Sequence, residues 1–154
     1  MIQRIYIDTS IVGGYFDEEF KEATNLLFQR LEAREVIFVV SDLLDLELLN
    51  APNQVKELLL KFPSEFFERV GLSQEAVGLA DSYIHEKVVG LTSIEDCRHI
   101  AMATIHKVDV LASWNFKHIV NFQKIPLYNA INTLNGYRNI HIFSPMELEV
   151  DDGK

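Results

Sequence analysis

Oxygen-bearing side chains recur at four places in the sequence, each beside an apolar segment or at the start of a helix-like segment. They are Asp8, Glu47, Asp96 and Asn115, with the hydroxyl groups of Thr9 and Ser113 next to two of them. Hard divalent cations such as Mg²⁺ and Mn²⁺ prefer oxygen ligands. Carboxylates that gather without a cation repel one another, and their pKa values rise. These residue types therefore predict a metal site, which also offers a phosphate group a positive charge in an acidic protein.

Strand-like and helix-like segments alternate along the chain and must position these side chains. Apolar, β-branched runs predict strands over 2–7, 36–40, 108–113 and 140–143, with 69–72 as a further short strand. Apolar spacing predicts helices over 17–32, 42–49, 54–62, 73–88, 94–106, 116–121 and 128–134, and Gly13-Gly14 predicts a loop. This alternation favours an α/β fold with a parallel sheet. Chemistry in such sheets sits at the carboxyl ends of the strands, here after Ile7, Val40 and Ala112.

Composition indicates a single globular domain. The chain has 154 residues, of which 48% are apolar and 24% charged, so disorder of the whole chain is excluded. We expect one domain over 1–148 and a polar tail over 149–154. The single cysteine, Cys97, excludes an internal disulfide and zinc sites built on paired cysteines, and it favours a reducing, cytoplasmic setting. We expect no secretory signal and no membrane partner, because no apolar stretch reaches membrane-spanning length.

The charge balance limits the class of nucleic acid that the chain can bind. There are 14 basic and 23 acidic residues, which give a net charge of −9. A broad basic face for duplex DNA is therefore not expected. Single-stranded or loop RNA, met by a small basic patch or by bound cations, is the better prediction.

Several of the acidic residues have a structural interpretation beside the functional one. Asp8 can be a turn or cap residue, and Asp42 and Asp45 suit the first turn of a helix, which Ser41 can cap. Residues two apart lie about 200° round a helix, so Asp45 and Glu47 cannot both face one site. Among them, Glu47 is the candidate for the site.

The start of the helix over 94–106 allows two capping arrangements. Ser93-x-x-Asp96 fits a capping box, in which the acidic side chain binds the backbone of the cap residue. Thr92-x-x-Glu95 fits the same pattern equally well, and that arrangement leaves Asp96 free for a site.

Four segments, in this order along the chain, resemble the motifs of PIN-domain nucleases. They are Tyr6-Ile7-Asp8-Thr9-Ser10, Ser41-x5-Glu47-Leu48, Glu95-Asp96-x-x-His99-Ile100-Ala101-x-Ala103 and Leu111-Ala112-Ser113-Trp114-Asn115-Phe116-Lys117-His118. The resemblance implies a Rossmann-like, three-layer α/β/α domain with a central parallel sheet. It also implies a metal-dependent endoribonuclease that is similar to the VapC-type toxins of toxin–antitoxin pairs.

By position, the resemblance makes Asp8, Glu47 and Asp96 the acidic ligands of one or two Mg²⁺ or Mn²⁺ ions. Asn115 stands where many members have a further aspartate, so it brings an amide oxygen and no charge. Thr9 and Ser113 would orient the carboxylates through their hydroxyl groups. An ion in this setting activates water for phosphodiester hydrolysis and stabilises the transition state.

Substrate contacts are expected close to Asn115. Lys117 and His118 can bind phosphates, and Arg98 lies either near the cleft or on the solvated face. Trp114 and Phe116 can stack on unpaired bases, although packing in the core is the more common role of such aromatic residues. His99 is expected to pack behind the site and not to act as a general base.

The resemblance implies two partners besides RNA: an antitoxin protein and a second copy of the chain. The alternative function is a PIN-like module that binds RNA or protein without cutting, which the neutral Asn115 keeps open. A phosphoryl-transfer enzyme of the haloacid-dehalogenase type would need an aspartate where Ser10 stands. A dinucleotide-binding enzyme would need a G-x-G-x-x-G motif after the first strand, and the sequence has none there.

Overall fold

A five-stranded parallel sheet forms the centre of the computed structural model, which describes residues 2–148. The order across the sheet is β3-β2-β1-β4-β5. The strands are β1 (Gln3–Ile7), β2 (Val36–Ser41), β3 (Phe67–Val70), β4 (Val110–Ala112) and β5 (Ile142–Phe143). The predicted parallel sheet is thus confirmed, while the predicted tail over 149–154 lies outside the described residues.

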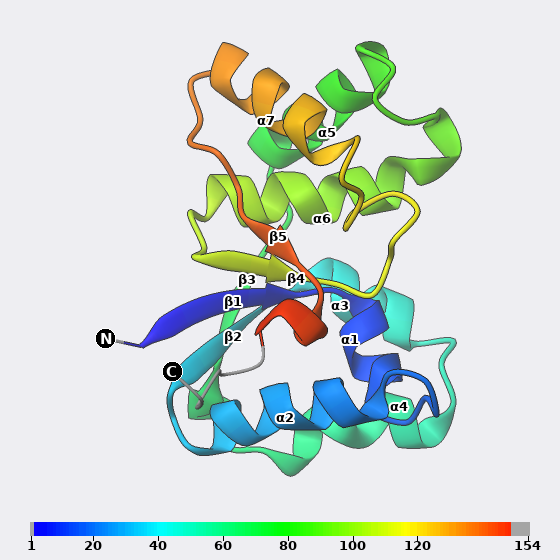
Figure 1. The fold of residues 1–154 in the computed structure, drawn as a ribbon, viewed down its shortest axis with the longest axis vertical. Coiled ribbons are helices and arrows are strands. Elements are labelled where there is room, and N and C mark those ends of the chain that lie inside the picture. The colour runs from blue at the N-terminus through cyan, green and yellow to red at the C-terminus, as the bar shows by residue number, and fades with distance from the viewer. Residues whose placement is uncertain (1, 149–154) are drawn as a thin grey trace.

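Helices cover both faces of the sheet. They are α1 (Thr9–Gly14), α2 (Lys21–Glu32), α3 (Asp42–Leu48), α4 (Asn53–Glu57), α5 (Gln74–His85), α6 (Ile94–Ile105) and α7 (Ile125–Leu134). Helices α5, α6 and α7 lie above the sheet in Figure 1, and α1, α2 and α4 lie below it. This arrangement confirms the predicted three-layer α/β/α fold.

The strands divide their side chains between two cores, because successive residues of a strand point to opposite faces. On β1, Ile5 and Ile7 join the core beneath α1 and α2, whereas Tyr6 joins the core beneath α5 and α6. The same alternation holds on β4, where Leu111 faces the α6 side and Ala112 the other side. A buried polar group on the α6 side of β1 therefore points toward α6.

Two predicted elements differ from the observed ones. The predicted helix over 116–121 consists of turns, because the Asn121 amide donates to the carbonyls of Phe116 and Lys117, and Lys124 also donates to the Lys117 carbonyl. The predicted helix over 54–62 is divided into α4 and a short 3₁₀ helix, Leu58–Lys61. In the second segment the consecutive side chains of Leu58 and Leu59 are both buried.

The predicted loop at Gly13-Gly14 is wrong, because both residues belong to α1. A Cβ atom at Gly14 would lie 2.6 Å from Nε1 of Trp114, so the glycine allows α1 to approach the indole ring closely. The predicted strand over 69–72 forms earlier in the chain, as β3. Within residues 2–148, no helix has the length and apolar character needed to cross a membrane.

Candidate active site

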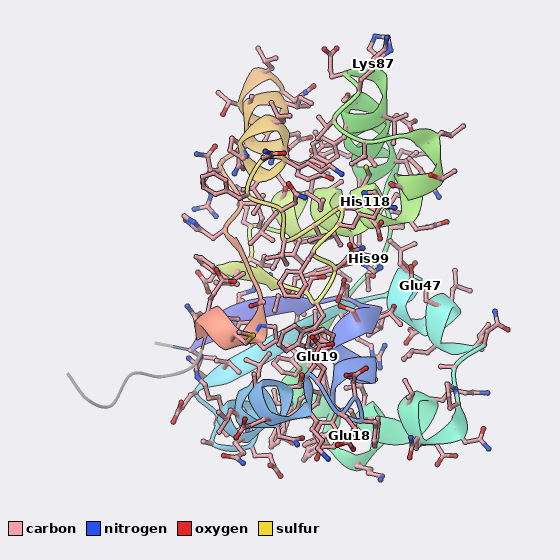
Figure 2. The ribbon with its side chains drawn as sticks, turned by 45° about the vertical axis from the view of Figure 1, so that its right-hand side comes forward. Glu18, Glu19, Glu47, Lys87, His99 and His118 are labelled. Atoms are coloured by element: carbon pink, nitrogen blue, oxygen red, sulfur yellow. The ribbon has the colours of Figure 1, made fainter. Side chains whose placement is uncertain are left out.

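The four predicted oxygen donors lie on elements that end or begin at the carboxyl edge of the sheet. Asp8 directly follows β1, and Asn115 follows β4 by three residues. Glu47 is carried by α3, which begins directly after β2, and Asp96 lies in the first turn of α6. Figure 2 shows Glu47 and His99, from α3 and α6, pointing toward one another at this edge.

Asp8 is buried and is held by two hydroxyl groups. Ser10 donates to Oδ1 and Ser113 donates to Oδ2, both at 2.6 Å. The same two hydroxyl oxygens accept the backbone N–H groups of Trp114 and Asn115, at 2.8 and 2.9 Å. Burial raises the pKa of Asp8 above its ordinary value, although these hydroxyl donors oppose the rise. The Asp8 carboxylate is therefore oriented before any ligand arrives.

Helix α3 turns Glu47 toward the site and Asp45 away from it. Leu44 and Leu48 are buried, and Glu47 borders this apolar stripe with its side chain 30% exposed. Asp45 lies on the exposed face and pairs with Arg69 at 3.1 Å. The helical spacing argument that separated these two acidic residues is confirmed. Asp42 is also engaged away from the site, since its carboxylate accepts a hydrogen bond from the backbone N–H of Leu72.

The Glu47 carboxylate is engaged by two other elements. Nε2 of His99, from α6, lies 3.0 and 3.2 Å from its two oxygens, and the Thr9 hydroxyl of α1 donates to Oε1. Burial alone would raise the pKa of Glu47, but the hydrogen bond and charge of His99, together with Thr9, hold it below its ordinary value. Glu47 is thus stabilised as a carboxylate.

His99 connects the three carboxylates electrostatically. Burial alone would lower the pKa of His99, but the hydrogen bond and charge of Glu47, followed by the charges of Asp8 and Asp96, raise it overall. The imidazole is only 2% exposed. The charges of all three predicted acidic ligands therefore act on one buried ring, and Glu47 contacts it directly.

Asp96 takes no part in a capping box, because Ser93, the N-cap residue of α6, makes no side-chain cap hydrogen bond. The half-buried position raises the pKa of Asp96, and the His118 ring and the Asn115 amide oppose the rise. Asn115 in turn accepts the backbone N–H of His118 through Oδ1, at 3.0 Å. Asp96 and Asn115 thus form one side of the candidate site.

A small cationic cluster lies beside Asp96. Lys124 donates through Nζ to the Lys117 carbonyl at 2.9 Å and lies 3.2 Å from Nδ1 of His118. Burial and the charge of Lys124 lower the pKa of His118. Lys117 itself is exposed, and Arg98 is half-buried, with its buried Nε lacking a hydrogen-bond partner among the described residues.

Of the two roles considered for Trp114, the structure shows core packing, and the predicted contact with RNA is wrong. Its ring is 6% exposed, stacks on Phe20 with centroids 4.2 Å apart, and donates from Nε1 to Thr24 at 2.8 Å. Because both the face and the N–H group are used within the protein, the ring offers no surface for an unpaired base. Phe116, by contrast, is 46% exposed.

Three contributors to the site were missed or underrated from the sequence. Ser10 holds Asp8, His99 contacts Glu47 directly, and Lys124 accompanies His118. Ser10 had a usable signal, since a side chain two residues after a strand-end aspartate lies within reach of that carboxylate. The contacts of His99 and Lys124 depend on how separate elements pack, and no local pattern indicates them.

The donor set fits a hard divalent cation by its chemistry. Asp8, Glu47, Asp96 and Asn115 all present oxygens, and a cation would offset the burial that raises the pKa of Asp8 and Asp96. Across residues 2–148, however, no three Asp, Glu, His or Cys side chains stand close enough to hold a metal ion between them. In this arrangement the Glu47 carboxylate is occupied by His99 and Thr9.

Comparison of the sequence with family models and with curated proteins gives no match. Several solved structures with a similar fold are toxin–antitoxin proteins. VapBC2 of Rickettsia felis, bound to a DNA fragment from its promoter, has a TM-score of 0.60 at 16% identity, covering 92% of this chain and 98% of that chain. DNA-bound VapBC of Salmonella typhimurium has a TM-score of 0.59 at 17% identity, covering 94% and 99%.

A third similar structure is VapC20 of Mycobacterium tuberculosis, a toxin described as cleaving the sarcin-ricin loop. It has a TM-score of 0.55 at 10% identity, covering 88% of this chain and 98% of that chain. The likeness extends over most of both chains in each comparison. Together with the parallel sheet and its covering helices, these similarities show that the chain has the PIN-domain fold of the VapC toxins.

Proposed function

We propose that the chain is a divalent-metal-dependent endoribonuclease and the toxin of a toxin–antitoxin pair. The observation that carries this proposal is the placement of Asp8, Glu47 and Asp96 on elements that end or begin at the carboxyl edge of the sheet, where Glu47 contacts the buried His99. Carboxylates brought together at such an edge suit a cation and a phosphodiester substrate. The similarity to an RNA-cleaving toxin supports RNA as the substrate.

In this proposal Asp8, Glu47, Asp96 and Asn115 hold Mg²⁺ or Mn²⁺. When bound, the cation supplies positive charge that stabilises the transition state of phosphodiester hydrolysis. Ser10 and Ser113 keep the Asp8 carboxylate in one orientation through their hydrogen bonds. Lys117 and Lys124 supply positive charge, and His118 supplies a further polar contact, for the RNA backbone next to Asp96.

The test is cleavage of labelled single-stranded RNA in Mn²⁺, Mg²⁺ or EDTA. We expect the wild type to cut RNA only when a metal is present. Asp8→Asn and Asp96→Asn should each lower the cleavage rate by more than about 10- to 100-fold, which is the loss typical of removing a residue that only supports a metal ligand. The matched control is Asp45→Asn, because Asp45 lies on the exposed face of α3 and pairs with Arg69. This control should cut like the wild type.

Equal activity in all four proteins would mean that a contaminating ribonuclease does the cutting. No cutting by the wild type on several RNAs would instead favour a module that binds RNA or protein without hydrolysis. The neutral Asn115 is the observation behind that second candidate. An antitoxin and a second copy of the chain remain the predicted protein partners.

A further inference from the structure

A chain of hydrogen-bonding groups runs from the middle of the sheet to Glu47. The Tyr6 hydroxyl on β1 donates to Oγ of Ser41 at 3.0 Å and lies 2.7 Å from Nδ1 of His99. On the other side of the imidazole, Nε2 lies 3.0 and 3.2 Å from the oxygens of Glu47. Residues from β1, β2 and α6 are thus linked in series to one side chain of α3, which His99 contacts directly.

Burial makes this chain rigid. Tyr6 and Ser41 are 0% exposed and His99 is 2% exposed, so none of these three groups can exchange its partner for solvent. The Tyr6 and His99 rings meet edge to face, with centroids 5.7 Å apart. Buried polar groups that are fully paired keep one geometry, because breaking a bond there leaves an unpaired group. The imidazole is therefore fixed in position and in rotation.

The positions of the protons follow from the partners. Glu47 is held as a carboxylate and has no proton to give, so Nε2 of His99 must carry the hydrogen between them. The Tyr6 hydroxyl contacts Nδ1 whichever of the two atoms carries the hydrogen between them. In each case the contact with Glu47 is an Nε2–H donor facing a carboxylate.

We propose that His99, fixed by Tyr6, is the positioning residue that holds the Glu47 carboxylate in place for the cation. The inference rests on the proposed function, because it assigns a role in the same site. Glu47 is a long side chain on a seven-residue helix, and without His99 only the Thr9 hydroxyl would restrain it among the described residues. Asp8 has two hydroxyl donors, Ser10 in the first turn of α1 and Ser113 directly after β4, and so does not depend on His99 in this way.

Two substitutions of similar size and polarity separate the two sides of the imidazole. The amide nitrogen of His99→Gln reaches about as far as Nε2, so it keeps a donor for Glu47 and loses the contact with Tyr6. The shorter His99→Asn replaces Nδ1, so it keeps a partner for Tyr6 and loses the contact with Glu47. Tyr6→Phe removes the hydroxyl and leaves His99 with its bond to Glu47 alone.

The measurement is the affinity of each purified protein for Mn²⁺ by titration calorimetry, without RNA. We expect His99→Asn to weaken Mn²⁺ binding by about 10- to 100-fold, the loss typical of removing a partner that orients a metal ligand. His99→Gln should keep most of the affinity. Tyr6→Phe should fall between the two, because the imidazole keeps its donor but loses its support.

Controls separate positioning from folding. Tyr83→Phe removes another buried tyrosine hydroxyl on the same face of the sheet, which donates to Asn132 and touches no residue of the site. It should lose stability in thermal unfolding and keep the wild-type affinity for Mn²⁺. Equal Mn²⁺ affinity in His99→Asn and His99→Gln, with both proteins folded, would overturn the proposal.

A second readout does not depend on the metal. The ring-nitrogen chemical shifts of His99 by NMR should show a protonated Nε2 at neutral pH in the wild type, and a deprotonated Nε2 would overturn the proposal. If the wild type neither binds Mn²⁺ nor cuts RNA, the proposed function fails, and the NMR result still decides whether His99 donates to Glu47.

Discussion

At the scale of single residues, the site depends on how closely α1 approaches the loop after β4. Gly14 lies against the indole ring of Trp114, and Trp114 is fixed by its hydrogen bond to Thr24 and its stacking on Phe20. The backbone N–H of Trp114 donates to Ser10, which in turn donates to Asp8. A change in this contact is therefore transmitted to the Asp8 carboxylate.

Gly14→Ala should lower the free energy of unfolding by about 1–3 kcal/mol, the usual cost of inserting a methyl group into a packed core. The new Cβ would lie 2.6 Å from Nε1 and 2.7 Å from Cδ1 of Trp114, and neither atom is free to move. Urea unfolding measures the effect. Gly13→Ala is the matched control, since nothing lies within 4 Å of its added Cβ, and helix propensity favours alanine by up to about 1 kcal/mol. Equal stability of the two variants would contradict the close contact.

At the scale of the elements, Arg4 ties three of them together. From β1 it donates to both carboxylate oxygens of Glu68 on β3, at 2.8 Å each, across the intervening β2. Its Nη1 also donates to the carbonyls of His106 and Lys107, at the end of α6. Because the strands are hydrogen-bonded to one another, these contacts of Arg4 stabilise the whole sheet. The candidate site lies at the other end of the strands, at their carboxyl ends.

Arg4→Gln should destabilise the protein at neutral pH, and the deficit should shrink in acid. The hydrogen bond and charge of Arg4 hold the pKa of Glu68 below its ordinary value. For a carboxyl group with a lowered folded pKa, the stabilisation is present above the unfolded pKa and is lost as pH falls through the folded pKa. The difference in unfolding free energy between wild type and variant should therefore narrow from about pH 7 to about pH 4.

Urea unfolding at several pH values measures that difference. It should not vanish, because the bonds to the two carbonyls do not titrate in this range. Arg69→Gln is a suitable comparison, since its pair with Asp45 is exposed and such pairs contribute only about 0–1 kcal/mol. A deficit for Arg4→Gln that grows toward acid pH would disprove the role assigned to Glu68.

At the scale of the whole molecule, two cores share one sheet. One core lies beneath α5 and α6, and the other lies beneath α1 and α2 and contains Trp114. Since successive residues of each strand belong to different cores, neither face can unfold without removing the packing of the other. We therefore expect the described domain to unfold in one cooperative transition.

Trp114, the only tryptophan, reports on the α2 side, while far-UV circular dichroism reports on the whole chain. The two transitions should coincide in urea. Leu79→Ala, which makes a cavity under α5, should shift the Trp114 transition by about 2–5 kcal/mol although it lies in the other core. Leu134→Ala, at a side chain that is 83% exposed, should leave it almost unchanged. A Trp114 transition that ignores Leu79→Ala would show that the two faces unfold separately.

The sequence by itself determined the parallel α/β sheet, the order of its main elements and the edge of the sheet to which the candidate oxygen donors belong. These follow from local periodicity and chain order: apolar runs define the strands, and the residue after a parallel strand lies at its carboxyl end. The separation of Asp45 from Glu47 is likewise a consequence of helical geometry alone.

Only the tertiary structure decided which side chain meets which. His99 and Glu47 are 52 residues apart, Thr9 and Glu47 are 38 apart, and Trp114 and Thr24 are 90 apart. A periodic pattern states which face of an element a residue occupies, but the distance between two elements depends on the volumes packed between them. For that reason the partners of Trp114 and the contact of His99 with Glu47 emerged only once the helices were placed around the sheet.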